Sequence, residues 1–127
     1  MLIIDSDVLI EILDRKSHRG DEALRKVEAS EEEIAVTAIS LHEVLYGLCK
    51  YGKPVKELLS LPILSYTKRD AELSSRIELE MERKGKPTSR TDAMIAAITI
   101  NNKAKLYTFN LKHFNAFKDS GLELCPV

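Results

Sequence analysis

The alternation of short apolar segments with amphipathic segments constrains the fold of this chain more than any other feature. The amphipathic segments carry apolar residues at helical spacing, and glycine or proline ends several of them. Strands that alternate with helices favour a parallel sheet covered by helices on both faces. We therefore predict an α/β fold, a three-layer α/β/α sandwich around a central, mainly parallel sheet. The expected strands are residues 2–4, 34–37, 63–66, 104–108 and 122–125.

The expected helices follow from the spacing of their apolar residues. Leu41, Val44, Leu45 and Leu48 recur at i, i+3, i+4 and i+7, which places them in one apolar stripe. Such a stripe can contact a partner chain, but packing in the core is the simpler explanation. The expected helices cover residues 8–13, 21–29, 40–51, 55–61, 68–84 and, apolar on nearly every side, 93–100.

Length and composition suit one domain over residues 1–127. The chain is 44% apolar, and its 19 basic and 20 acidic residues give a formal net charge of −1. Because this balance lacks a basic excess, any RNA contact must use local basic patches or bound cations. No apolar run approaches the ~18 residues of a membrane span. Cys49 and Cys125 match no zinc or disulfide spacing, so we expect reduced thiols in a cytoplasmic protein.

Three acidic residues and one amide occupy equivalent places in the predicted sheet. Asp5 ends the first strand, Glu43 lies early in the helix after the second, Asp92 precedes the buried helix, and Asn110 follows the fourth strand. Sites in parallel sheets form beyond the carboxyl ends of the strands, so these side chains should converge. Two carboxylates at ~5 Å repel by roughly 3 kcal/mol at an effective dielectric of ~20, which a cation would offset. Hard oxygen ligands suit Mg²⁺ or Mn²⁺.

Each of these residues also has a purely structural explanation. Asp5 can cap the first helix, and residues 40–43 and 89–92 read as a capping box and a variant of one. Asn110 suits a turn after a strand. Taken singly, each acid is better explained by capping, and only their joint arrangement favours a metal site.

Four segments of the chain resemble the PIN-domain family and, within it, the VapC toxins of toxin–antitoxin pairs. They are residues 4–10 (IDSDVLI), 40–47 (SLHEVLYG), 92–97 (DAMIAA) and 106–114 (LYTFNLKHF), in the family's order and at its spacing. The resemblance implies a compact sandwich that hydrolyses RNA phosphodiester bonds with a water activated by Mg²⁺ or Mn²⁺. It further implies a cognate antitoxin and a homodimer.

The resemblance carries metal-ligand roles onto Asp5, Glu43 and Asp92. It also points to Asp7, two residues after the first acid, either as a further ligand or as a first-turn acid that favours the helix dipole. Thr108 can orient the site through its hydroxyl, although an ordinary strand threonine explains it as well. The chain departs from the family at Asn110, where an acid is common.

A second departure is His113, which stands where the family commonly has aspartate. We expect His113 to pack or cap locally and His42 to be an exposed helix residue. The two departures leave open a catalytically degenerate module that binds a partner without cutting. A receiver-type phosphoacceptor domain fits less well, because residues 64–68 (LSYTK) contain no acid at the end of the third strand.

Basic residues near the expected site are the candidates for contact with RNA. Arg90 is the preferred candidate, because it lies two residues before Asp92. For any one of the lysines, a solvated helix end is the simpler explanation. The full set is Lys50, Lys53, Arg83, Lys84, Lys86 and Arg90.

Overall fold

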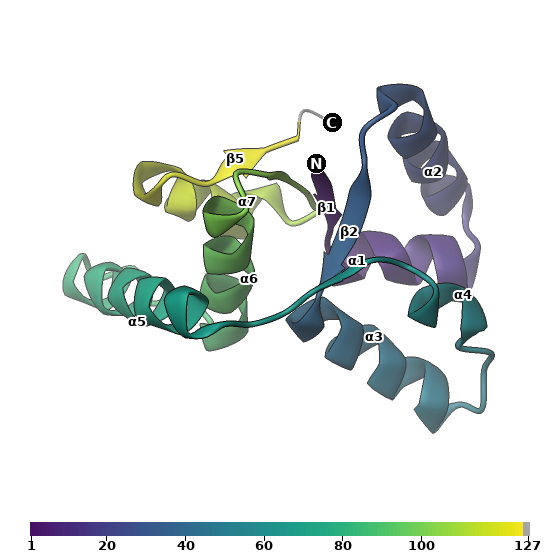
Figure 1. Cartoon of the computed structure of the whole chain (residues 1–127), viewed down its shortest axis with the longest axis horizontal. Coiled ribbons are helices and arrows are strands. Elements are labelled where there is room, and N and C mark those ends of the chain that lie inside the picture. The colour runs from purple at the N-terminus through teal and green to yellow at the C-terminus, as the bar shows by residue number, and fades with distance from the viewer. Residues whose placement is uncertain (126–127) are drawn as a thin grey trace.

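In the computed structural model, which describes residues 1–125, the strands form one five-stranded sheet in the order β3-β2-β1-β4-β5. Every neighbouring pair is parallel, and Ile3 of the central strand pairs with Ala35 on one side and Leu106 on the other. The mainly parallel sheet is thus confirmed (Figure 1). The strands are β1 (Leu2–Ile4), β2 (Ile34–Thr37), β3 (Ile63–Leu64), β4 (Lys105–Tyr107) and β5 (Glu123–Leu124).

The edge strand β3 is shorter than the predicted segment 63–66. It pairs with β2 only through Val36–Ile63 and Thr37–Leu64. Because β2 ends at Thr37, where the next helix begins, the residues after Leu64 have no strand to pair with. The length of β3 is therefore set by where β2 ends, rather than by the sequence of residues 63–66.

The helices agree with the expected segments except near the carboxyl end, where two short ones were not anticipated. These are α7 (Leu111–Phe114) and the 3₁₀-helix η2 (Asn115–Ser120). The first helix also changes type, because it continues as a π-helix, η1. The others are α1 (Ser6–Leu9), η1 (Ile10–Arg15), α2 (His18–Ser30), α3 (Ala38–Lys50), α4 (Lys56–Leu59), α5 (Lys68–Arg83) and α6 (Arg90–Asn101).

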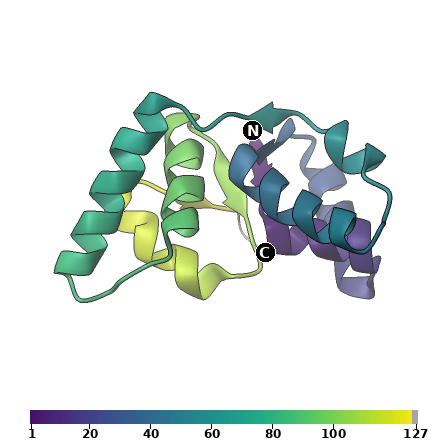
Figure 2. The same ribbon diagram turned by 90° about the horizontal axis from the view of Figure 1, so that it is seen from below.

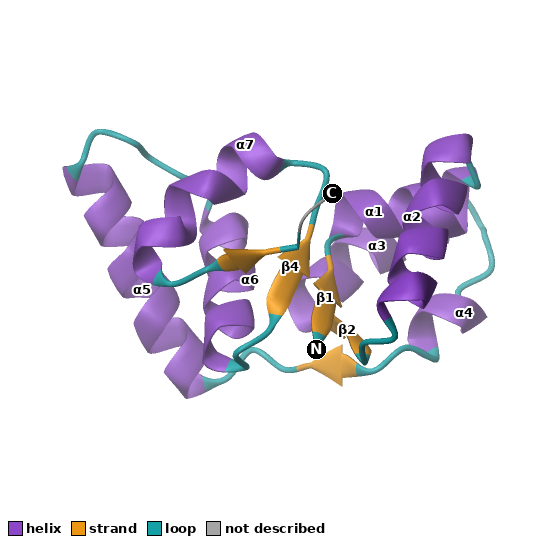
Figure 3. Cartoon of the chain, turned by 90° about the horizontal axis from the view of Figure 1, so that it is seen from above, coloured by secondary structure: helices purple, strands orange, loops and turns teal. Residues whose placement is uncertain are grey.

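The sheet lies between two groups of helices, which gives the three-layer sandwich (Figures 1 and 3). Leu2 and Ile4 pack into the cluster that contains α1 to α4, whereas Ile3 packs with α5, α6, Phe114 and Phe117 on the other face. This alternation follows from the two-residue period of a strand. The stripe of α3 belongs to the first cluster, so core packing of that stripe is confirmed. Figure 2 shows the two helix groups from below.

The start of α3 corrects one interpretation of the sequence. Thr37, not Ser40, caps the helix, and its hydroxyl accepts a hydrogen bond from the Ser40 backbone N–H at 3.0 Å. Ser40 is instead fully buried inside the helix, and within residues 1–125 its hydroxyl has no hydrogen-bond partner. The capping box at residues 40–43 is therefore wrong. Glu43 is consequently not needed to cap the helix.

The start of α6 follows the sequence more closely. Ser89 is the N-cap, and its hydroxyl accepts a hydrogen bond from the backbone N–H of Asp92 at 3.1 Å. The helix begins at Arg90, three residues before the expected start. Asp92 therefore lies in the first turn of α6, and this helix packs against α5 and β4. Among residues 1–125, no helix combines the length and the apolar character that crossing a membrane would require.

Candidate active site

Asp5 is the buried centre of the acidic cluster at the carboxyl end of β1. It is 5% exposed. Its Oδ1 accepts a hydrogen bond from the Ser6 backbone N–H at 2.8 Å, and its Oδ2 accepts one from the Thr108 hydroxyl at 2.7 Å. Oδ1 thus caps helix α1, which confirms the capping role expected for Asp5, while Oδ2 is bound by the residue that follows β4. Burial, with smaller contributions from the charges of Asp7 and Asp92, raises the pKa of Asp5 to about 6.

Asp7 joins the first helix to the segment that follows β4. Its Oδ2 accepts hydrogen bonds from the Phe109 backbone N–H at 3.2 Å and from the Thr108 hydroxyl at 3.4 Å. Partial burial raises its pKa, whereas these hydrogen bonds and the charge of Arg19 act in the opposite direction. Asp7 therefore holds the site together, and its carboxylate stays next to that of Asp5.

Glu43 and Asp92 bring the second and third acids to the same edge. Helices α3 and α6 contact each other there. Loss of water around the Glu43 carboxyl raises its pKa, and the nearby negative charges of Asp92 and Asp7 raise it further. The structure therefore places the carboxylates of Asp5, Asp7, Glu43 and Asp92 within electrostatic reach of one another.

This acidic cluster is open rather than a closed ligand cage. Within residues 1–125, no group of three or more His, Cys, Asp or Glu side chains is arranged to hold a metal ion directly. The carboxylates of Asp5 and Glu43 are nonetheless buried and close to other negative charges, so their ionised forms are destabilised. A bound divalent cation would stabilise the ionised forms instead. Mg²⁺ keeps several of its own waters and needs only one or two protein carboxylates, so the chemistry of the cluster fits such an ion.

Asn110 and His113, the two departures from the family pattern, lie beside Asp92. The backbone N–H of Asn110 donates to the Thr108 hydroxyl at 3.0 Å, and its side-chain Nδ2 lies 3.0 Å from His113 Nδ1. The same His113 nitrogen lies 3.8 Å from Asp92 Oδ2. The two residues therefore link the end of β4 to the start of α6, and His113 makes the local contact expected for it.

Three of the predicted RNA-contact residues, Arg90, Lys50 and Lys53, are engaged with other side chains. The Arg90 guanidinium donates two hydrogen bonds to Glu78 of α5, at 3.1 and 3.2 Å. Lys50, the last residue of α3, lies over the rings of Tyr46 in the same helix and of Tyr51, which follows it. To contact phosphate, Arg90 would have to exchange Glu78 for the substrate, so its role stays a prediction.

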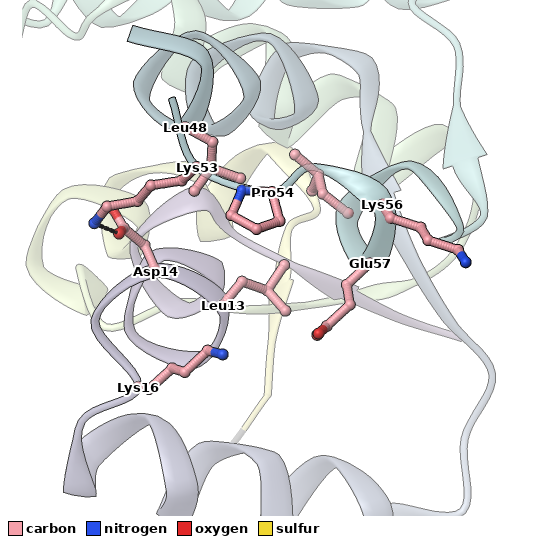
Figure 4. Close-up of a pocket in the computed structure, with 9 residues that line it drawn as sticks. Leu13, Asp14, Lys16, Leu48, Lys53, Pro54, Lys56 and Glu57 are labelled. Carbon is pink, nitrogen blue, oxygen red and sulfur yellow. Dashed lines mark hydrogen bonds and ion pairs between the residues drawn. The ribbon is translucent and has the colours of Figure 1, made fainter. Parts of the chain in front are cut away.

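Lys53 belongs to a different hollow of about 560 Å³ between η1, α3 and α4 (Figure 4). It forms an ion pair with Asp14 there, and Leu13, Leu48 and Pro54 supply apolar walls. The residues that line this hollow do not include Asp5, Glu43 or Asp92. Lys53 is therefore removed from the acidic cluster.

The sequence profile of the PIN domain matches residues 2–119. The chain belongs to the PIN-domain family. The match spans every strand of this PIN domain except β5, together with all four acids of the cluster. No curated protein matches the sequence.

Solved structures similar to this PIN domain include toxin–antitoxin complexes. VapBC2 from Rickettsia felis, bound to promoter DNA, has a TM-score of 0.80 at 23% identity, covering 98% of this chain and 96% of that chain. A toxin–antitoxin complex from Klebsiella pneumoniae has a TM-score of 0.73 at 26% identity, covering 90% of each chain. Mycobacterium tuberculosis VapC20, described as a toxin that cleaves the sarcin-ricin loop, has a TM-score of 0.65 at 15% identity, covering 96% of each chain.

Two residues of the site were not anticipated from the sequence. Arg19 of α2 lies with its guanidinium carbon 3.7 Å from the centre of the Phe109 ring, and its charge lowers the pKa of Asp7. Lys112 of α7 lines a hollow together with Asp92. No local signal could have revealed either, because Arg19 reaches the site only through the packing of α2, and the helix that carries Lys112 was not expected.

Proposed function

We propose that this PIN domain is a Mg²⁺- or Mn²⁺-dependent endoribonuclease, the toxin of a VapBC-type toxin–antitoxin pair. The observation that carries the proposal is the gathering of Asp5, Glu43 and Asp92 at the carboxyl edge of the sheet, where burial and the negative charge of Asp92 both raise the pKa values of Asp5 and Glu43. A fold that assembles such charges without enough nearby cations gains from a divalent ion. Membership of the PIN family and the similarity to VapBC structures support the choice of RNA as substrate.

Asp5, Glu43 and Asp92 would hold the ion. A bound Mg²⁺ or Mn²⁺ would supply an activated water and shield the charge that develops on the phosphate. Thr108 orients the Asp5 carboxylate by donating to one of its oxygens, and Asp7 fixes the backbone after β4. The Asn110 amide, which lies 3.0 Å from His113 Nδ1, would help to orient the attacking water.

The partners of the protein are part of the same proposal. We infer a cognate antitoxin, because toxin–antitoxin complexes are found among the similar structures. A homodimer is part of the proposal only because the resemblance to the family implies one. An RNA substrate also agrees with a cytoplasmic location. The alternative is a degenerate PIN module that binds a partner without cutting, which the open acidic cluster and the Asn110 and His113 replacements would favour.

Cleavage of a structured RNA in Mg²⁺ or Mn²⁺ tests the proposal. We expect the wild type to cut and Asp92→Asn to lose at least about 100-fold in rate, since the ion contributes several kcal/mol to the transition state. Asp119→Asn, which changes the same charge in η2, should cut like the wild type. Equal rates for wild type and Asp92→Asn would end the proposal.

Calorimetric titration with Mn²⁺ separates the nuclease from the degenerate module. The nuclease should bind Mn²⁺, and binding should be lost in Asp92→Asn but retained in Asp119→Asn. A wild-type protein that binds no Mn²⁺ would support the degenerate module instead.

A further inference from the structure

A hollow of about 270 Å³ opens beside Asp92, which is one of the residues that line it. Its walls come from the segment between α5 and α6 and from α7. Lys86 and Lys112 line it from these two elements, and His113, whose Nδ1 lies 3.8 Å from Asp92 Oδ2, lines it as well. Asp92 is thus shared between the hollow and the acidic cluster, so a molecule in the hollow lies next to the proposed metal ion.

The two lysines give this hollow a positive charge that is not already committed. Both are exposed, and within residues 1–125 neither forms an ion pair. Arg90 and Lys53 differ in this respect, because Glu78 and Asp14 already hold their charges. Asp92 is the acid that lines the hollow, and a divalent ion bound to it would cancel its repulsion toward an anion.

The shape and lining of the hollow favour a phosphate over a nucleobase. Its volume falls below the ~300–1,000 Å³ of most small-molecule pockets, which is too small for a whole nucleotide and its neighbours. Recognition of unpaired bases relies on stacking on aromatic or guanidinium planes. The residues that line this hollow include no Tyr, Phe, Trp or Arg, and the one ring among them, His113, is engaged by Asn110 at 3.0 Å and lies 3.8 Å from Asp92. The two lysines act as point charges suited to phosphate oxygens.

We propose that this hollow binds a backbone phosphate of single-stranded RNA, adjacent to the phosphodiester that is cut, through Lys86 and Lys112. The inference rests on the proposed function, since it takes RNA as the substrate. Because phosphate contacts carry no base information, the two lysines set the position of the strand rather than the sequence that is cut.

The salt dependence of RNA binding tests this subsite without relying on cleavage. The measurement is the fluorescence anisotropy of a short labelled single-stranded RNA in Mg²⁺, with Glu43→Gln as the parent so that the strand stays intact. Each lost phosphate contact should lower the slope of log K against log salt by about 0.7, which at about 0.1 M salt is roughly a fivefold loss of affinity. Lys86→Ala/Lys112→Ala should therefore bind roughly 25-fold more weakly than the parent.

The matched control is Arg25→Ala/Lys26→Ala, which removes two charges from α2 at the opposite end of the molecule (Figure 1). We expect the control to change affinity less than about twofold and to leave the salt slope as it is. Equal losses in the two double variants, an unchanged slope in Lys86→Ala/Lys112→Ala, or no RNA binding by the parent would overturn the subsite.

The outcomes of this experiment and of the cleavage assay are independent. A wild-type protein that does not cut, combined with a lysine-dependent salt slope, would remove the nuclease and keep the phosphate subsite. A protein that cuts RNA with an unchanged slope in the lysine variant would keep the nuclease and remove the subsite.

Discussion

Asp5 and Asp70 are both buried aspartates, but their surroundings differ in kind. Asp70, 3% exposed, accepts hydrogen bonds from the Thr67 backbone N–H and hydroxyl, both at 2.9 Å, and from the Asn101 amide at 2.8 Å. Asp5 is similarly buried, but its neighbours include Asp7 and Asp92, whose charges raise its pKa. A carboxylate surrounded by donors stabilises a helix start, whereas one that also faces other carboxylates is repelled by their charges, and a bound cation would relieve that repulsion.

The largest expected difference between the two aspartates is in activity. Asp5→Asn should lower RNA cleavage by at least about 100-fold, because it removes a proposed ligand of an ion that contributes several kcal/mol. Asp70→Asn should leave the rate per folded molecule within about threefold of the wild type. Rates of RNA cleavage, normalised to the folded fraction by circular dichroism, measure both. A large loss in Asp70→Asn alone would reverse the assignment of the two roles.

The next difference concerns the pH dependence of stability without divalent metal. The pKa of Asp5 rises from 3.8 to about 6 on folding, so the folded protein binds the proton more tightly than the unfolded chain. Its contribution to stability is therefore present below pH ~4 and is lost as the pH rises to ~6, a change of about 3 kcal/mol at ~1.4 kcal/mol per pKa unit. Urea unfolding in EDTA at several pH values measures this change.

Asp5→Asn should remove most of this fall in stability, and Mn²⁺ added at neutral pH should offset it in the wild type. Asp70→Asn serves as the control, because it should leave the Asp5-dependent fall in place. If stability in EDTA falls equally between pH 4 and pH 6 in Asp5→Asn and in the wild type, the ionisation of Asp5 is not the source of the fall.

Removal of the Asp70 side chain should have the third-largest effect, on stability. Asp70→Ala leaves the Asn101 amide and the Thr67 N–H without their acceptor, and it should destabilise the protein by about 2 kcal/mol. Asp5→Asn, by contrast, should be neutral or stabilising at neutral pH in EDTA. Chemical denaturation of the two variants measures both free energies of unfolding. If Asp5→Asn proved more destabilised than Asp70→Ala, the proposed difference between the two aspartates would be wrong.

The smallest expected effect comes from Thr108, which donates to Asp5 as Thr67 donates to Asp70. Thr108→Val removes this donor and should cost about 1 kcal/mol of stability. It should also raise the pKa of Asp5 further, so activity should fall more steeply as the pH is lowered. Thr108→Ser keeps the hydroxyl and should show the wild-type pH profile of cleavage. If Thr108 had only a structural role, Thr108→Val and the wild type would show the same pH profile.

The sequence predicted the sheet and the convergence of the acids because both follow from periodicity and parallel topology. The three central strands lie where the apolar segments place them. Asp5 follows β1 and Asp92 lies in the first turn of α6, as expected, whereas Glu43 lies one turn deeper in α3 than expected. The sequence indicated the wrong N-cap for α3. The motif at residues 40–43 indicates a helix start at Ser40 only if a loop separates the helix from the preceding strand. In the structure β2 runs directly into α3.

Contacts between distant elements were beyond reach of the local pattern. The Arg90–Glu78 ion pair depends on how α5 lies against α6, and the hollow at Lys86 and Lys112 depends on α7, a one-turn helix too short for its apolar spacing to be recognised. Residues that build the core were therefore predictable, whereas the partners of surface cations were not.

The position of β1 in the middle of the sheet has a consequence for synthesis on the ribosome. The residues of β1 emerge first, but its second partner, β4, begins only at Lys105. The Thr108 hydroxyl that donates to Asp5 lies 103 residues away in the chain. Such long-range pairing is slow to form and delays folding until late in translation. A nascent chain that has not yet reached Thr108 therefore lacks part of the candidate site.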